Sequence, residues 1–377
     1  GRGTIVTPGL IDLHTHIYWG GTSLGVDPDS YALKSACTLL VDAGSAGPGN
    51  YPGFARHVLK PAFPRMLAYL HISFAGIYAF SSRIMVGESH NMRLMAAHEA
   101  REIAAEYSES IVGIKVRVGR HASGPSGIAP LDVAMDVAEE TGLPLMVHID
   151  EPPPTYAEVV GRLRKGDVLT HCFRPFPNAP VNGKGEIRPA ILEARKRGVI
   201  FDVAHGMGSF SWKSARVMLD KGFRPDVISS DVHALCLDGP AHDNLHVMTK
   251  FLALGWSLGE VIEAASAAPA RLLGLADQGA SAVRSNWGCQ CIPRSGWPDR
   301  PDGCHWGDCS VRSSSDLGWD CGGRRMARGV VDIANSGSRR PDAKPPIKSV
   351  NLITLPRPCK QIWNSVNHTG SIPKCAF

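Results

Sequence analysis

Several features that would assign a chain to other protein classes are missing from this sequence. No apolar run in its 377 residues approaches the ~20 residues of a membrane-spanning helix. No secretory signal opens the chain. The formal net charge is only +5, and the sequence contains no long basic run and no nucleic-acid-binding motif. We therefore expect no membrane partner and no nucleic-acid partner.

Cysteine is sparse in most of the chain. Only Cys37, Cys172 and Cys236 occur before residue 276, although the chain has 10 cysteines in total. Scattered cysteines are typical of cytoplasmic proteins with reduced thiols, which is the compartment that we expect.

Periodic apolar segments are missing from the last hundred or so residues, which are rich in Cys, Trp, Arg, Ser, Gly and Pro. Such a composition buries little aliphatic surface. Cys289, Cys291, Cys304 and Cys309 suggest a second zinc site, but their spacing matches no familiar pairing. We therefore divide the chain into a folded domain, residues 1–275, and an irregular tail, residues 276–377, that is either disordered or translated out of frame.

Strand-like and helix-like stretches alternate from residue 11 to about residue 270. Eight strands are predicted, at residues 11–18, 36–42, 66–75, 111–117, 144–149, 167–171, 199–203 and 226–231. Most are followed by a predicted helix, at residues 51–59, 91–107, 129–140, 156–163, 186–196, 212–221, 246–254 and 258–267. This alternation predicts an α/β fold of the (β/α)8 TIM-barrel type. The alternative, a doubly wound sheet, would need a glycine-rich phosphate-binding turn after the first strand, which is absent.

Residues able to bind a metal ion occur at the ends of several predicted strands. His14 and His16 are two residues apart, so in a strand they point to the same side. The full set is His14, His16, Lys115, His148, His171 and Asp231. Active sites of these barrels lie at the carboxyl ends of the strands, where all six would meet. Taken singly, each histidine is more simply a core residue and the aspartate a helix cap.

Lys115 is the most informative member of this set. A lysine is rarely buried without a partner, and burial near cations lowers its pKa. The neutral amine can then add carbon dioxide and become a carbamate able to bridge two metal ions. The alternative is a lysine that reaches solvent or forms a salt bridge.

Several segments together resemble the amidohydrolase superfamily, and within it the amidohydrolase/deacetylase branch, whose members are often called dihydroorotase-like. They are residues 7–16, 42–47, 113–117, 201–206 and 229–234. The resemblance covers residues 4 to about 275. It implies a small β-sandwich domain built from both chain ends. Here the N-terminal strands are absent and no strands are predicted after residue 275, so we expect that domain to be missing or incomplete.

The resemblance also implies roles for the residues of the site. His14, His16 and Asp231 would bind one divalent metal ion, and His148 and His171 the other. A carbamylated Lys115 and a hydroxide would bridge the two ions. Zn²⁺ suits these ligands best, although manganese, iron and cobalt are alternatives.

Three further roles concern catalysis. Asp231 would transfer protons, and Lys115 would act through its carbamate. His205, after the seventh strand, would contact the substrate or polarise the leaving group, the alternative being a solvated loop histidine. Arg117 would pair with a substrate carboxylate or, as we prefer, form a structural ion pair.

The function that follows is a metal-dependent hydrolase of an amide or ester, deacetylase-like, in which a metal-bridging hydroxide attacks a small acyl substrate. A cyclic-amide hydrolase of the dihydroorotase or hydantoinase type is one alternative. A non-catalytic barrel that serves as an interaction module is another. Self-association into a homo-oligomer stays open.

Overall fold

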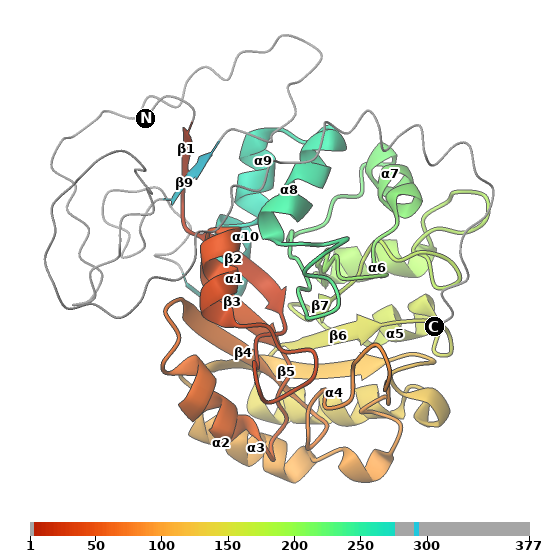
Figure 1. Cartoon of the computed structure of the whole chain (residues 1–377). Helices are drawn as coiled ribbons and strands as arrows, with labels where there is room; N and C mark the ends of the chain where they lie inside the picture. The colour runs from red at the N-terminus through yellow and green to blue at the C-terminus, as the bar shows by residue number, and fades with distance from the viewer. Residues whose placement is uncertain (1–3, 276–289, 294–377) are drawn as a thin grey trace, which may run out of the picture. The chain divides into compact units, whose positions relative to one another are not determined.

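A curled sheet of seven parallel strands, paired in chain order, forms the centre of the protein (Figure 1). The computed structural model describes residues 4–275 and 290–293. The seven strands are β2 (Leu10–Thr15), β3 (Cys37–Ala43), β4 (Arg65–His71), β5 (Ile111–Val118), β6 (Leu145–Ile149), β7 (Val168–Leu169) and β8 (Ile200–Phe201). They match seven of the eight predicted strands, and each pairs with its successor in parallel.

The predicted eighth strand is not continuous in the structure and forms only two isolated β-bridges. Asp202 pairs with Val227, and Thr15 pairs with Val232, in isolated parallel bridges. Between these bridges the backbone of Asp231 has a φ of 50°, which is incompatible with extended strand geometry. The segment nevertheless lies between β8 and β2 and closes the sheet, as a (β/α)8 barrel requires.

Helices follow most of the strands and cover the outer face of the sheet (Figure 1). They are α1 (Pro28–Ser35), α2 (Tyr51–Phe54), α3 (Ala97–Glu106), α4 (Ala129–Thr141), α5 (Tyr156–Arg162), α6 (Pro189–Arg197), α7 (Trp212–Asp220), α8 (Asn244–Ala253), α9 (Leu258–Ala264) and α10 (Ala267–Leu272). Shorter turns complete the set: the π-helical η1 (Ala55–Leu59) and the 3₁₀ turns η2 (Met92–Leu94) and η3 (Gly124–Ser126).

Two predicted helices are divided in the structure, and one helix was not predicted. The expected helix over residues 91–107 breaks at Ala96, whose ψ of 66° is not helical. The expected helix over residues 258–267 breaks at Ser266, which separates α9 from α10. The unpredicted helix is α1, which starts where the Asp27 side chain accepts hydrogen bonds from two backbone amides and Pro28 follows.

A separate two-stranded antiparallel sheet lies outside the barrel. It pairs β1 (Thr4–Thr7) with β9 (Gln290–Pro293), and the sequence pattern predicted neither strand. Four residues of the expected irregular tail therefore form a strand. The remaining predictions for the tail, namely disorder, an out-of-frame origin and a second zinc site, fall outside the described residues.

Apolar side chains fill both faces of the barrel sheet. Leu10, Leu40 and Val116 belong to the layer between sheet and helices, whereas Ile11 and Val41 belong to the cluster inside the barrel. The three cysteines of this domain are buried free thiols. Within residues 4–275 and 290–293, no helix has the length and apolarity needed to cross a bilayer.

Asp12 ties the first strand to the segment that closes the barrel. Its carboxylate accepts hydrogen bonds from Ser230 N at 3.0 Å, Ser230 Oγ at 2.5 Å and Tyr31 Oη at 2.7 Å. Each buried donor that is left without an acceptor costs about 1–3 kcal/mol. We therefore expect Asp12→Ala to lower the free energy of unfolding, measured by urea titration, by more than Tyr31→Phe, which removes one donor. Equal losses in the two variants would contradict this role.

Candidate metal centre

An irregularity in β2 turns two histidines toward the inside of the barrel. Ile11 and Leu13 pack in the inner cluster, so in a regular strand His14 and His16 would face outward. The register between β2 and β3 shifts between Asp12 and Thr15, as at a β-bulge. A bulge re-aims the side chains that follow it, and both imidazoles consequently point to the same interior space.

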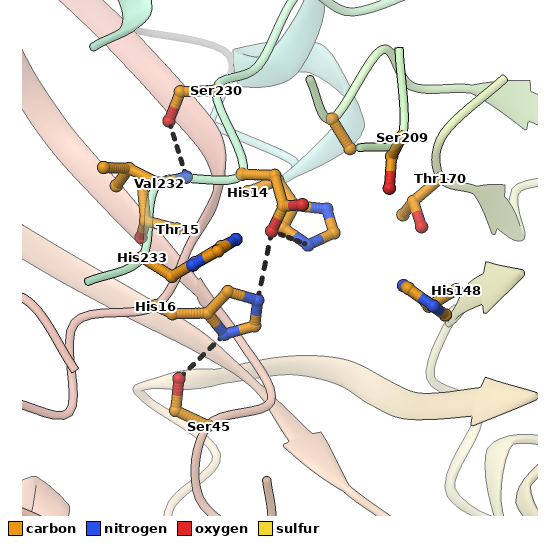
Figure 2. A network of polar contacts seen from close by, with 12 residues as sticks. His14, Thr15, His16, Ser45, His148, Thr170, Ser209, Ser230, Val232 and His233 are labelled. Atoms are coloured by element: carbon orange, nitrogen blue, oxygen red, sulfur yellow. Dashed lines mark hydrogen bonds and ion pairs between the residues drawn. The ribbon is translucent and has the colours of Figure 1, made fainter. Parts of the chain in front are cut away.

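His14, His16 and Asp231 form a buried cluster with the spacing of a metal site. Asp231 Oδ1 lies 3.3 Å from His14 Nε2 and 3.2 Å from His16 Nε2. One ligand atom from each of the three residues lies within 4.8 Å of the others, and all three residues are buried. Figure 2 shows the rings of His14 and His16 in this cluster. The structure thus brings together residues from the first and last parts of the barrel.

Each of these histidines has a hydrogen-bond partner on its other nitrogen. His14 Nδ1 lies 3.3 Å from Asp202 Oδ2, and His16 Nδ1 lies 2.9 Å from Ser45 Oγ. Partners of this kind fix the orientation of a ring and leave its second nitrogen to bind a metal ion. The sequence analysis did not identify Asp202 or Ser45 as site residues. The available signal was their position, at the end of a predicted strand and in the segment 42–47.

His148 and His171 form the second group. His148 Nδ1 lies 2.6 Å from His171 Nε2, and His171 Nδ1 lies 2.7 Å from the carbonyl oxygen of Ala204. Burial lowers the pKa of both histidines well below the usual range, so both are neutral, the form that binds metal ions. The ring centroids of His14 and His171 are 5.5 Å apart, so the two groups adjoin.

Lys115 is completely buried within β5, three residues before the strand ends. Its Nζ has no hydrogen-bond partner in the described structure. Burial is the main cause that lowers its pKa to about 7, although the carboxylate of Asp231 opposes the shift. Gly44 makes room for the side chain, since a Cβ at that position would lie 2.5 Å from Lys115 Cγ.

Divalent metal ions fit the residues that the structure places here. Lys115 Nζ and His148 Nε2 are buried polar atoms that have no hydrogen-bond partner among the described residues, and a native interior rarely leaves such atoms unsatisfied. Imidazole nitrogens and carboxylate oxygens are the ligands that zinc and similar ions prefer. His14, His16 and Asp231 would hold one ion.

His205 lies beside this centre, but both of its ring nitrogens are occupied. Nε2 lies 2.7 Å from Lys250 Nζ, and Nδ1 lies 3.0 Å from the carbonyl oxygen of Gly206. The ring stacks on Phe210 with centroids 4.6 Å apart. His205 Nε2 would contact a substrate only after its contact with Lys250 breaks. The catalytic role of His205 therefore stays a prediction.

Arg117 forms an ion pair inside the protein, as we preferred. Its Nη1 lies 3.2 Å from Glu88 Oε2, and its guanidinium lies over the ring of Phe80. Glu88 Oε1 lies 3.2 Å from His71 Nε2. Glu88 comes from the long connection between β4 and α3, and nothing in the sequence pattern indicated this residue.

A barrel with this cluster at the carboxyl ends of its strands has the architecture of a metal-dependent enzyme, and comparisons with known proteins agree. Residues 5–172 match the Amidohydrolase family. The chain is 34% identical over 275 residues to a deacetylase of Brucella anthropi, covering 73% of this chain and 68% of that protein. It is 33% identical over 274 residues to deacetylase Atu3266 of Agrobacterium fabrum, covering 73% of this chain and 67% of the relative.

Solved structures show the same relationship. A dihydroorotase structure is 33% identical, with a TM-score of 0.67, over 73% of this chain and 72% of the other. An adenine deaminase structure is 29% identical, with a TM-score of 0.71, over 78% of this chain and 84% of the other. The chain belongs to the amidohydrolase family and is a hydrolase of that family.

The close approach of Gly44 to Lys115 allows a matched test. Gly44 and Gly127 both have positive φ, 85° and 54°, but a Cβ at Gly127 would meet nothing within 4 Å. Alanine at either position carries a backbone cost of about 1–2 kcal/mol. We expect only Gly44→Ala also to displace Lys115 and reduce the metal content, measured by mass spectrometry on the purified protein. Equal metal content in the two variants would contradict the packing role of Gly44.

Proposed function

We propose that this chain is a metal-dependent deacetylase that hydrolyses an amide or ester bond of a small acyl substrate. The observation that carries the proposal is the convergence of three groups at one end of the barrel. These groups are the cluster of His14, His16 and Asp231, the pair of His148 and His171, and the buried Lys115. Two divalent ions would be held there, and Zn²⁺ fits the donor set best.

A carbamate on Lys115 would complete the set of ligands. The neutral amine adds carbon dioxide, forms an N–C bond and releases one proton. The product is a carboxylate on a long side chain that could serve both ligand groups. Among the described residues the buried Nζ has no hydrogen-bond partner, which supports this role, because a permanently charged amine would need a counterion there.

Bound metal ions would supply an activated water near neutral pH and polarise the substrate carbonyl. The protein would contribute proton transfer through Asp231. Its carboxylate faces the interior, between His14 and His16, and can accept the proton of the attacking water. It would then return that proton to the leaving nitrogen or oxygen. His205 would assist from the edge of the site once its Nε2 is free.

The choice of acyl substrate is supported by the relatives named deacetylases. Cyclic-amide hydrolysis is the second candidate, because the similar structure at 33% identity is a dihydroorotase. Retention of all six expected residues argues against a non-catalytic barrel. Turnover of N-acetyl amino acids, acetylated hydroxy acids and cyclic ureides by the metal-loaded protein separates the candidates. Hydrolysis of the ureides alone would overturn the proposal.

Replacing Lys115 with alanine should remove activity and reduce the bound metal, because the variant cannot form the carbamate. A short carboxylic acid added to the assay should restore part of the activity by occupying the same space. Lys196→Ala, which removes a surface lysine paired with Glu193 on α6, is the control. Full metal occupancy together with normal turnover in Lys115→Ala would exclude the bridging role.

Replacing Asp231 with asparagine should separate proton transfer from metal binding. The amide oxygen can still coordinate a metal ion, but the amide is a poor proton acceptor. General acid–base catalysis contributes about 10²–10⁴ in rate, so kcat should fall by about that factor while metal remains bound. Turnover within a few-fold of the unmodified protein would show that Asp231 does not transfer the proton.

A further inference from the structure

Two arginines lie near the candidate metal centre, and their electrostatic surroundings differ. Arg117 is neutralised by Glu88 at 3.2 Å. Arg174 has no such partner, since no carboxylate in residues 4–275 lies within ion-pair distance of it. Its only side-chain hydrogen bond in that part of the chain joins Nη1 to Ser209 Oγ at 3.2 Å. Its Nε is buried and has no hydrogen-bond partner among the described residues.

The backbone at Arg174 is fixed close to the second ligand group. Its amide donates to the carbonyl oxygen of His171 at 3.1 Å, and its carbonyl oxygen accepts from Ser214 Oγ at 2.8 Å. The side-chain partner Ser209 lies on the same side of the cluster as Thr170 and His148 (Figure 2). The guanidinium is therefore anchored at the edge of the site.

The electrostatics agree with this placement. Burial lowers the pKa of His171, and the charge of Arg174 is the largest electrostatic contribution that lowers it further. The same charge also lowers the pKa of His148, after the larger effects of burial, Arg117 and His171. The bonds of Arg174 to the carbonyl oxygen of His171 and to Ser209, rather than these shifts, place it next to this pair of histidines.

An unpaired guanidinium in a partly buried site carries a desolvation cost that a counterion would offset. Burial lowers the pKa of Arg174, yet an arginine stays protonated in proteins, so its charge persists. Its planar fork matches a carboxylate, which it can bind through two parallel hydrogen bonds. Asp150, Glu151 and Asp231 favour its charge electrostatically, but all three lie beyond ion-pair distance of it.

We propose that Arg174 binds a carboxylate of the substrate, so that the enzyme selects acyl compounds that carry an acid group over neutral acyl compounds. This inference rests on the proposed hydrolase function and narrows its substrate class. Ser209 acts as a positioning residue, because its hydroxyl holds the guanidinium at the edge of the site.

Binding of a matched pair of probes tests the inference without turnover. Isobutyrate and isobutyramide have the same shape and differ in charge. Calorimetry on the metal-loaded full chain should show isobutyrate binding about 10- to 100-fold more tightly, as expected for charge-assisted hydrogen bonds. In Arg174→Met the difference should fall below about threefold. An unchanged difference in this variant would mean that metal ions alone hold the carboxylate and would overturn the inference.

Two further variants keep the test decisive. Arg188→Met removes an arginine from the same connection between β7 and α6, where it bonds the carbonyl oxygen of Ala179, and should leave the difference intact. Arg174→Lys keeps the charge but loses the fork, so it should retain only part of the selectivity. If Arg174→Met does not fold, the comparison of Arg174→Lys with the unmodified protein still tests whether the guanidinium binds the carboxylate. Equal affinity for the two probes in the unmodified protein would refute the role of Arg174.

A kinetic comparison separates this inference from the proposed function. N-acetyl amino acids should be hydrolysed with a higher kcat/KM than the corresponding N-acetyl amino acid amides, and Arg174→Met should remove that preference. If Arg174→Met lowers kcat/KM equally for both substrates, Arg174 has only a structural role. Probe binding that depends on Arg174, combined with no hydrolysis of any acyl compound, would refute the proposed function while leaving the carboxylate site standing.

Discussion

Closure of the barrel between its first and last strand positions is the constraint on which the candidate site depends. Asp231 N donates to the carbonyl oxygen of His14, and His16 N donates to the carbonyl oxygen of Val232, both at 2.8 Å. These two bonds bring Asp231 against a pair of histidines more than 200 residues earlier in the chain. Gly206 leaves room for the carboxylate of Asp231, since a Cβ there would lie 2.2 Å from Asp231 Oδ2.

Burial sets the charge state of this centre. It lowers the pKa of His16 to about 3 and raises the pKa values of Asp202 and Asp231 to about 7 and about 6. Lys115, with a pKa of about 7, completes a group of residues whose charged forms are all disfavoured. Such a group is costly in an apolar interior unless a cation or a proton balances it. Metal binding and a modified lysine would both reduce that cost.

The barrel and the loops have separate tasks. Residues on the strands and in the segments just after them form the candidate metal centre. Deacetylases and a dihydroorotase structure are both similar to this part of the chain. Selection among substrates is then left to the connections after the strands. Glu88, after β4, neutralises Arg117, whereas no carboxylate of the described residues lies within ion-pair distance of Arg174 after β7. The two connections thus differ in whether a described carboxylate accompanies their arginine.

The sequence by itself determined the alternation of strands and helices and the residues that end the strands, because both depend on local spacing. His14, His16 and Asp231 could be named for that reason, and Lys115 because a lone lysine in an apolar strand is unusual. The turn of β2 toward the interior, the partners Asp202 and Ser45, and the pairing of β1 with β9 could not be predicted. Each depends on contacts between segments far apart in the chain, whose register no local pattern specifies. Only the tertiary structure decided which arginine has a counterion, since that depends on where Glu88 lies in three dimensions.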